Sequence, residues 1–344
     1  MIRAGVIGCG TIARLRHIPE YAANPHVELA GFYDRTECRA AELSAQYGGC
    51  VYPSPEAMLA DPAIHAVSIC TSNHLHAPLT IQALRAGKHV LCEKPMATTL
   101  EDCRAMVRAA EESGRFLMIG QNQRLSPVHR KARELIASGA IGTILTFQTT
   151  FGHGGPDEWA QAGPDLWFFD KSSAGLGALA DLGIHKVDLI VYLTGSRVTT
   201  VSAMTGTLDK RTGTGAPVPV EDNAVCLLQL ESGALGTLTA SWTRYGAAES
   251  STVLYGTKGI LQITDDPAAP ITLTGRDRKA QVFQPEQDHS PGAPSGVIDA
   301  FVESILTGTA PALSGRSVLP AMQAIFAALE SAQTGRTVRI EPDA

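Results

Sequence analysis

Short apolar runs and amphipathic stretches take turns along the first 120 residues of the chain. The apolar runs are almost continuous, as in strands that are buried on both faces. They occupy residues 2–8, 27–33, 50–52, 66–71, 89–92 and 116–120. Helical patterns fill the intervals at residues 11–23, 37–47, 77–86 and 100–113. This alternation predicts a parallel sheet that is covered by helices on both sides.

The pattern changes near residue 145, where strand-like segments follow one another at short intervals. They lie at residues 144–151, 199–207, 223–230, 235–243, 251–255 and 259–264. Short turns, such as residues 231–234, predict hairpins and a mainly antiparallel sheet. Helical patterns remain at residues 127–138, 182–193, 295–306 and 317–333. We therefore predict an α/β domain at residues 1–122 and an α+β domain at residues 123–344.

Composition narrows the class of protein. A length of 344 residues fits two domains, and a net charge of -6 gives no electrostatic support for nucleic-acid binding. The seven cysteines are odd in number and form no C-x-x-C pair, which favours reduced thiols. No apolar run approaches the roughly 20 residues of a membrane helix, and the N-terminus has no signal-peptide pattern. We expect a soluble cytoplasmic protein with neither nucleic-acid nor membrane partners.

A glycine-rich loop joins the first strand to the first helix. In Gly8-Cys9-Gly10-Thr11-Ile12-Ala13, the first glycine permits a tight turn and the second allows a pyrophosphate close to the backbone. Ala13 is small enough for the helix to pack on the strand, and the helix N-terminus favours anions. The loop predicts a Rossmann dinucleotide site, to which we assign Gly8, Gly10, Thr11 and Ile12.

Asp34 stands at the end of the second strand, 24 positions after Gly10. A carboxylate at this place is suited to bind the adenosine ribose, and it repels a 2'-phosphate. The neighbouring Arg35 could instead stack on adenine or accept that phosphate. We therefore predict NAD as the cofactor, with NADP possible, and assign Asp34 and Arg35 to its binding.

Polar residues also follow the next strands, at the edge where open α/β sheets bind ligands. Thr71, Asn73 and His76 follow the strand at 66–71, and Glu93 and Lys94 follow the strand at 89–92. We assign these five residues to cofactor binding. A metal site is not predicted, because His74 and His76 have no third ligand at a useful spacing.

The helix at residues 181–195 carries a row of titratable groups on an otherwise apolar sequence. Asp181, His185, Asp188 and Tyr192 follow one another at i+4, i+3 and i+4, so they share one side. One interpretation makes Asp181 an N-cap and the others solvated surface. The other makes the row part of an active site, with Asp188 and Tyr192 in structural roles.

Five motifs in this order resemble the Gfo/Idh/MocA oxidoreductases, the glucose–fructose oxidoreductase and inositol dehydrogenase family. They are the glycine loop, Thr71-Ser-Asn-His-Leu-His76, Glu93-Lys-Pro95, Gly139-Ala-Ile-Gly142 and Asp181-Leu-Gly-Ile-His185. The resemblance implies a Rossmann domain, a second domain with an open β-sheet often used for oligomerisation, and a catalytic set of Lys94, Asp181 and His185. Residues 121–124, Gln-Asn-Gln-Arg, depart from the aromatic and two arginines that many members have.

These residues suggest a mechanism for oxidising a secondary alcohol. His185 is suited to remove the hydroxyl proton, and Lys94 to stabilise the developing alkoxide. Asp181 could hold a neighbouring hydroxyl or orient the imidazole. We also assign Asn122, Arg124 and Trp167 to substrate binding, with Lys94, Asp181 and His185. Trp159 and Trp167 could stack on a sugar face or pack against a partner subunit.

The sequence thus predicts an NAD-dependent dehydrogenase of a sugar, a sugar derivative or a cyclic polyol. Two alternatives remain: a glycoside hydrolase that oxidises its substrate transiently with NAD, and a catalytically silent NAD-binding regulator. Strands with apolar residues on both faces, such as residues 235–243, predict a homo-oligomer, either a dimer or a tetramer.

Overall fold

The computed structural model describes residues 1–160, 166–286 and 293–341. The chain forms two compact units: Met1–Asn122 with Asp288–Leu319, and Gln123–Gln287 with Pro320–Ala344. The sequence interpretation placed all of residues 123–344 in the second domain, whereas residues 288–319 belong to the first unit. In the described part of the chain, no helix is both long enough and apolar enough to cross a membrane.

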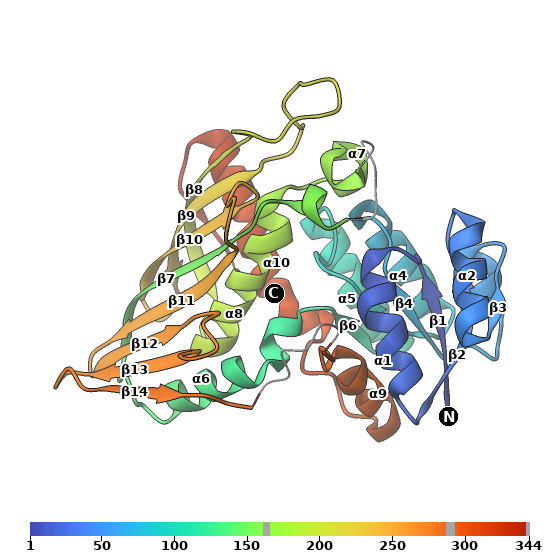
Figure 1. Cartoon of the computed structure of the whole chain (residues 1–344), viewed down its shortest axis with the longest axis horizontal. Coiled ribbons are helices and arrows are strands. Elements are labelled where there is room, and N and C mark those ends of the chain that lie inside the picture. The colour runs from blue at the N-terminus through green and yellow to red at the C-terminus, as the bar shows by residue number, and fades with distance from the viewer. Residues whose placement is uncertain (161–165, 287–292, 342–344) are drawn as a thin grey trace. The chain divides into compact units, whose positions relative to one another are not determined.

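The first unit contains a six-stranded sheet in which every pairing is parallel (Figure 1). Its order is β3 (Cys50–Val51), β2 (Val27–Tyr33), β1 (Ile2–Ile7), β4 (Ala66–Ile69), β5 (His89–Cys92) and β6 (Leu117–Ile119). The strand order reverses between β1 and β4, which is where such sheets bind ligands. The predicted parallel α/β architecture is confirmed.

Helices connect these strands and bury the sheet. They are η1 (Ala13–His17), α1 (Ile18–Ala23), α2 (Glu37–Tyr47), α3 (Pro55–Ala60), η2 (Asn73–Leu75), α4 (His76–Arg85) and α5 (Leu100–Ser113). The sequence pattern predicted one continuous helix where η1 and α1 lie, but η1 is a π-helix. Helix α3 was not predicted; it begins with Pro55, and Ser54 caps its first turn.

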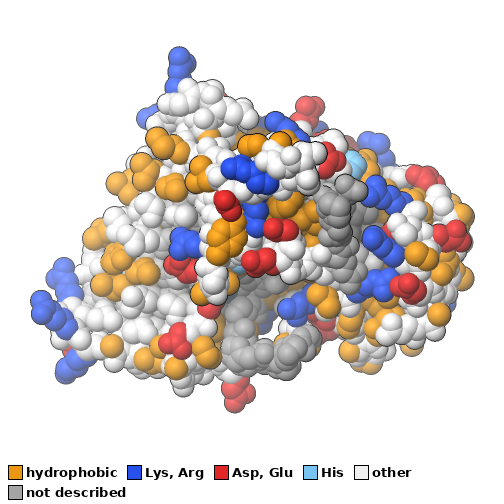
Figure 2. Space-filling model, turned by 45° about the horizontal axis from the view of Figure 1, so that its top comes forward, with side chains coloured by type: hydrophobic (Ala, Val, Ile, Leu, Met, Phe, Trp, Pro, Cys, Tyr) orange, Lys and Arg blue, Asp and Glu red, His pale blue; other side chains and the backbone are white. Residues whose placement is uncertain are grey.

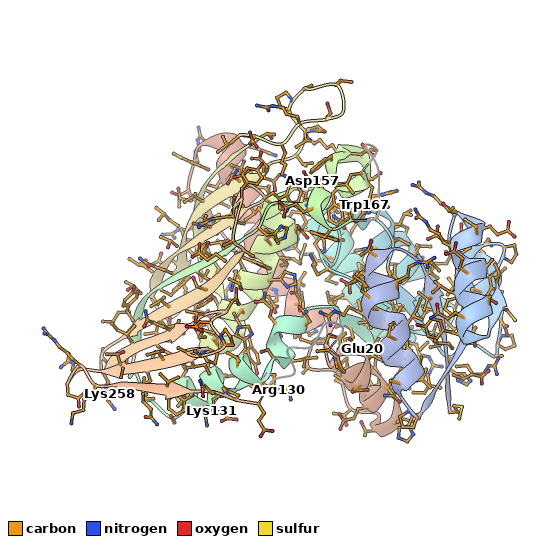
Figure 3. The ribbon with its side chains drawn as sticks, viewed as in Figure 1. Glu20, Arg130, Lys131, Asp157, Trp167 and Lys258 are labelled. Carbon is orange, nitrogen blue, oxygen red and sulfur yellow. The ribbon has the colours of Figure 1, made fainter. Side chains whose placement is uncertain are left out.

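Contacts between α1 and the segment around α9 hold residues 293–319 in the first unit. Helix α9 (Val297–Thr307) packs against α1. Glu20, labelled in Figure 3, accepts hydrogen bonds from the backbone N–H of Ser295 at 2.8 Å and from its hydroxyl at 3.0 Å. The Asn24 amide also donates to Asp299 at 2.7 Å. These partners are about 275 positions apart, so local sequence patterns do not reveal the pairing.

The second unit is built on a nine-stranded sheet. Its order is β14 (Ala280–Phe283), β13 (Ile271–Gly275), β12 (Gly259–Ile263), β11 (Glu249–Gly256), β7 (Ile144–Gly152), β10 (Leu235–Ser241), β9 (Asn223–Leu230), β8 (Val198–Gly206) and β15 (Val338–Arg339). Only the pairing of β7 with β10 is parallel, so the predicted mainly antiparallel sheet is confirmed. Strands β13, β14 and β15 were not predicted.

The two faces of this sheet differ. Helices α6 (Pro127–Ala137), η6 (Leu179–Gly183) and α8 (Ile184–Thr194) pack on one face (Figure 1). The core there includes Phe147, Leu238 and Leu254, each at most 1% exposed. Helix α10 (Gly315–Thr334) belongs to both units: its first residues, up to Leu319, are in the first unit, and the rest is in the second.

The opposite face carries no charged residue at its central positions. Strand register places together Thr200, Ser202 and Met204 of β8, Val225, Leu227 and Gln229 of β9, Leu235, Thr237 and Thr239 of β10, and Thr146, Gln148 and Thr150 of β7. We call these residues the outer face. Met204 is 82% exposed, Leu227 is 60% exposed, and Val225 and Leu235 are each 54% exposed.

Candidate active site

The glycine loop has the backbone that a dinucleotide site requires. Gly8 has φ +94°, and an added Cβ would lie 2.7 Å from the carbonyl of Cys70, so a larger residue would clash there. Gly10 differs, because an added Cβ would meet no atom within 4 Å. Ala13 is fully buried against the sheet. The loop is thus closely packed at Gly8 and open at Gly10, which fits the roles assigned to the two glycines.

Asp34 has a role that the sequence did not indicate. One carboxylate oxygen accepts the backbone N–H of Cys9 and the other accepts that of Thr36, both at 2.8 Å. The residue therefore ties the glycine loop to the end of β2. Each carboxylate oxygen can accept more than one hydrogen bond, so Asp34 keeps capacity for ribose hydroxyls. Arg35, beside it, is exposed.

His76 joins the segments that follow β4 and β5. Its Nδ1 lies 2.8 Å from the carbonyl oxygen of Pro95, its Nε2 lies 3.1 Å from that of Thr71, and it is 1% exposed. Burial lowers the pKa of the imidazole, although the two carbonyls oppose this. Both ring nitrogens thus lie beside carbonyl oxygens of the same unit, and the one that carries the hydrogen donates it. Asn73, in η2, is 6% exposed.

Glu93 immediately precedes Lys94 at the carboxyl end of β5. Its Oε1 lies 2.8 Å from Nε2 of His17, and its Oε2 accepts the backbone N–H of Lys94 at 3.1 Å. Burial disfavours ionisation of Glu93, but the hydrogen bond from His17 and the charges of His17 and Lys94 outweigh it. The pKa of Glu93 is therefore lowered. Direct cofactor binding by Glu93 and His76 stays a prediction.

In the second unit, the row of titratable groups is buried. Asp181 is 6% exposed, His185 is 8% exposed and Asp188 is 1% exposed. The interpretation of His185 and Asp188 as solvated surface is therefore wrong. Asp181 lies inside the π-helix η6, which continues into α8, and the N-cap of α8 is Gly183. The N-cap interpretation of Asp181 is therefore also wrong. π-Helical turns occur frequently at functional sites.

Asp181 contacts a cluster of four aromatic residues, Trp167, Phe168, Phe169 and Trp242, which we call the Trp242 cluster. The indole Nε1 of Trp242, just past β10, donates a hydrogen bond to Asp181 Oδ2 at 2.9 Å. The ring centroids of Phe168 and Phe169 lie 6.5 and 6.0 Å from that of Trp242. Trp167 stacks on Phe168 at 3.9 Å. Trp167 thus belongs to an aromatic surface that reaches the Asp181 carboxylate within this unit.

The segment that leads to this cluster is anchored by an ion pair. Lys210 Nζ lies 2.8 Å from both carboxylate oxygens of Asp157 and 5.2 Å from the ring centroid of Tyr245. Asp157 and Trp167 are both labelled in Figure 3. Residues 161–165, between Trp159 and Trp167, lie outside the described residues.

Phe151 of β7 contacts both His185 and the next residue on α8. Its ring centroid lies 5.9 Å from that of His185 and 5.7 Å from Nζ of Lys186. Lys186 also donates to the Ser250 hydroxyl at 2.7 Å and is 1% exposed. Burial lowers the pKa of Lys186 to about 8, although Asp265 and Glu249 oppose this. The helix thus carries a buried basic group beside His185.

Arg124, to which we assigned substrate binding, has a partner inside its own unit. Its Nε donates to Asp188 Oδ2 at 2.7 Å, its Nη2 also bonds the same carboxylate, and Arg124 is 8% exposed. Tyr192 lies under the guanidinium of Arg133 at 4.4 Å. Asp188 and Tyr192 therefore stabilise the packing of α8. Asn122 is exposed, and its role is untested.

The sequence interpretation missed two residues at these sites. His17 stands one helical turn past Ala13, and Trp242 directly follows a predicted strand, but no motif linked either of them to Glu93 or Asp181. The packing of helices on the two sheets brings these pairs together. No three His, Cys, Asp or Glu side chains form a potential metal site in the described parts of the chain.

Known proteins resemble this chain over both units. Residues 2–121 match the model of an oxidoreductase family with an NAD-binding Rossmann fold, and residues 129–262 match that of the GFO/IDH/MocA C-terminal domain. A levoglucosan dehydrogenase from Pseudarthrobacter phenanthrenivorans is 35% identical over 240 residues, which cover 64% of this chain and 60% of that protein.

Two further similarities cover nearly the whole chain. A 1,5-anhydro-D-fructose reductase from Ensifer adhaerens is 30% identical over 99% of both chains. The structure of a levoglucosan dehydrogenase in complex with NADH and levoglucosan superposes with a TM-score of 0.88. That structure is 27% identical and covers 99% of this chain and 100% of its own.

Proposed function

The chain belongs to the Gfo/Idh/MocA family of NAD-binding oxidoreductases, and we propose that it oxidises a secondary hydroxyl of a sugar, a sugar derivative or a cyclic polyol, or reduces the matching ketone. The observation that carries this substrate class is the contact between the Asp181 carboxylate and the Trp242 cluster. A carboxylate can accept hydroxyl hydrogens, and aromatic rings can cover the apolar face of a sugar. The names of the relatives support the same class.

The residues of the first unit fit NAD. Gly10 leaves open space beside the backbone, and Asp34 retains acceptor capacity for ribose hydroxyls. The loop Gly8 to Ile12 would hold the pyrophosphate, and Thr71, Asn73, Glu93 and Lys94 would surround the remainder of the cofactor. When bound, NAD supplies the acceptor for the hydrogen that leaves the substrate carbon as hydride.

We propose that Lys94, Asp181 and His185 act together on the substrate. His185 takes the proton of the reacting hydroxyl, since an imidazole titrates near neutral pH. The Lys94 ammonium donates a hydrogen bond to the same oxygen and stabilises its developing negative charge. Asp181 accepts a hydrogen bond from a neighbouring hydroxyl and thereby orients the ring. In the reverse direction, His185 returns the proton to the carbonyl oxygen.

A panel of polyols, aldoses and glycosides tests this proposal when each is incubated with the enzyme and NAD. A dehydrogenase accumulates NADH, read by absorbance, in proportion to the ketone or lactone formed. Glycoside cleavage without net NADH would favour the hydrolase alternative. Stoichiometric NAD binding without turnover on any compound would favour the silent regulator. Either of the last two results would overturn the proposed dehydrogenase.

We also propose that the outer face mediates a homo-oligomer, either a dimer or a tetramer. In Figure 2, mainly hydrophobic and uncharged side chains cover the sheet-bearing region of the second unit. Met204, Val225, Leu227 and Leu235 are each more than half exposed on this face. An apolar patch of this kind on a protein surface marks an interaction site. A second copy of the same face provides a matching uncharged surface.

A reducing compartment suits the thiols of this protein. All seven cysteines are free, and five of them are buried. Burial raises the pKa of several of these thiols, to about 12 for Cys9 and Cys226. Such thiols are protonated and unreactive at neutral pH. We propose the cytoplasm as the location, which fractionation of cells with an antibody to the protein would test.

A further inference from the structure

A chain of buried hydrogen bonds connects the helix that follows the glycine loop to the end of β5. Tyr21 of α1 and Ser68 of β4 lie with their hydroxyl oxygens 2.9 Å apart. Ser68 Oγ lies 3.0 Å from His17 Nδ1, and His17 Nε2 lies 2.8 Å from Glu93 Oε1. Tyr21, Ser68 and His17 are at most 3% exposed. Three separate elements thus converge on one carboxylate.

The direction of the last bond follows from the chemistry of Glu93. Its pKa is lowered, so it is a carboxylate and has no hydrogen to donate. His17 Nε2 must therefore carry a hydrogen and donate it to Oε1. At the other end of the hydrogen-bond chain, burial raises the pKa of Tyr21, so its hydroxyl keeps its proton. Water cannot replace these partners easily, because the groups are buried.

Glu93 transmits this contact to Lys94. While Oε1 accepts from His17, Oε2 accepts the backbone N–H of Lys94 at 3.1 Å. The carboxylate also packs against the end of β6, where a Cβ added to Gly120 would lie 3.0 Å from Oε1. The carboxylate is therefore fixed on three sides, and its orientation determines where the Lys94 backbone lies.

The same contact reaches the predicted cofactor loop. His17 is the last residue of the π-helix η1, which begins at Ala13, the last residue of the glycine motif. A π-helical turn changes the side-chain directions relative to a regular α-helix, and such turns are frequent at functional sites. The loop that would hold the NAD phosphates and the segment that carries Lys94 are thus joined through His17 and Glu93.

We propose that His17 is a positioning residue, which orients Glu93 and thereby places Lys94 relative to the cofactor loop. This inference rests on the proposed function, in which Lys94 binds the reacting oxygen. Positioning errors near 1 Å can slow an enzyme about 100-fold. His17→Phe removes the donor but keeps a ring, and we expect it to lower kcat about 10- to 100-fold. We expect His17→Gln, whose amide can donate, to recover part of this loss.

Lys88→Met provides the matched control. Lys88 is buried and directly precedes β5, whereas Glu93 directly follows it. The Lys88 ammonium donates to the carbonyl oxygens of Asp61 and Ile64, both at 2.7 Å. We expect this variant to lose stability but to keep its kcat per folded molecule. The melting temperature and the Kd for NAD are measured on all three variants. A kcat loss in His17→Phe with an NAD Kd within about threefold of wild type supports positioning.

A crystal structure of His17→Phe with NAD gives a readout that needs no substrate. We expect the Glu93 carboxylate to turn and its bond to the Lys94 N–H to break. An unchanged Glu93–Lys94 contact, or wild-type kcat in folded His17→Phe, would overturn the positioning role. Lys94→Ala separates the two proposals. If Lys94→Ala is slow and His17→Phe is not, only the positioning role fails; wild-type turnover in Lys94→Ala overturns the proposed function itself.

Discussion

The indole of Trp242 donates a hydrogen bond to one oxygen of the Asp181 carboxylate at 2.9 Å. Trp242 is fully buried, and its backbone N–H bonds the carbonyl oxygen of Asp222 at 2.8 Å. The indole therefore has little freedom to move, and it restricts the rotation of the Asp181 side chain. A carboxylate held in this way can present its oxygens to a substrate without first losing conformational entropy.

Trp242→Phe tests this relationship, because it removes the N–H donor and retains an aromatic ring. We expect kcat/KM to fall about 10- to 100-fold, in line with the roughly 1.5–3 kcal/mol that a hydrogen bond to a charged group contributes. The Kd for NAD should stay the same, because Trp242 and the glycine loop belong to different units. Steady-state kinetics and NAD titration on one preparation measure both. Unchanged kcat/KM would show that Trp242 only packs against the sheet.

Substitution of the proposed base and alkoxide stabiliser should slow turnover strongly. General acid–base catalysis contributes about 10²–10⁴-fold, so we expect kcat losses in this range for His185→Ala and Lys94→Ala. The Kd for NAD should barely change in His185→Ala but weaken somewhat in Lys94→Ala, since Lys94 follows a Rossmann strand. Melting temperatures serve as the folding control. A folded, NAD-binding His185→Ala enzyme with wild-type turnover would refute the assignment.

Asp34 should determine the choice between the two nicotinamide cofactors. Its carboxylate lies at the end of β2 beside the exposed Arg35, and it would repel the 2'-phosphate of NADP. We expect kcat/KM for NAD to exceed that for NADP at least tenfold, which corresponds to about 1.4 kcal/mol. Steady-state kinetics with both cofactors measure this ratio. An equal or inverted preference would show that Arg35 dominates the local electrostatics.

Lys186 should make stability depend on pH in a defined window. Its pKa is about 8 in the folded protein, whereas in the unfolded chain it should lie near the ordinary lysine value of 10.5. Between these values the unfolded chain binds the extra proton, so the free energy of unfolding rises with pH. At lower pH the full cost of burying the ammonium remains. We therefore expect the wild type to gain stability relative to Lys186→Met between about pH 8 and 10.

Urea unfolding of both proteins at pH 7.5 and pH 9.5 measures this difference. Other groups titrate in both proteins, so their contributions cancel in the comparison. The expected relative gain is on the order of 1–2 kcal/mol, at 1.36 kcal/mol for each pH unit of differential protonation. A difference that does not vary with pH would show that the buried ammonium is not destabilised.

Charge placed on the outer face should separate the subunits. Leu227 is 60% exposed and lies opposite Ser202 and Thr237 on the neighbouring strands. Two like charges would meet if Leu227→Glu formed the same symmetric interface. We expect an oligomer for the wild type and a monomer for Leu227→Glu in light scattering at micromolar concentration. Ser232→Glu, in the β9–β10 turn, serves as a control with the same charge, and a monomeric wild type would contradict the proposal.

The sequence alone determined the fold class of both units, because the patterns that indicate it are local. Continuous apolar strands such as β4, a glycine loop between β1 and η1, and alternation along β9 each reflect burial of the residues themselves. The catalytic candidates Lys94, Asp181 and His185 were also accessible from the sequence, because the short motifs that contain them resemble those of the Gfo/Idh/MocA family. Their roles remain predictions that the proposed variants test.

Only the tertiary structure decided which side chains support these residues. The pairs His17–Glu93, Trp242–Asp181 and Arg124–Asp188 are separated by 76, 61 and 64 positions. Chain folding brings each pair together through strand register and helix packing. No single segment of the sequence has a pattern that reveals such a pairing. For the same reason, the sequence did not predict that residues 293–319 belong to the first unit. Helix α9 shows an apolar face in sequence, but the surface that covers it, α1, lies at the other end of the chain.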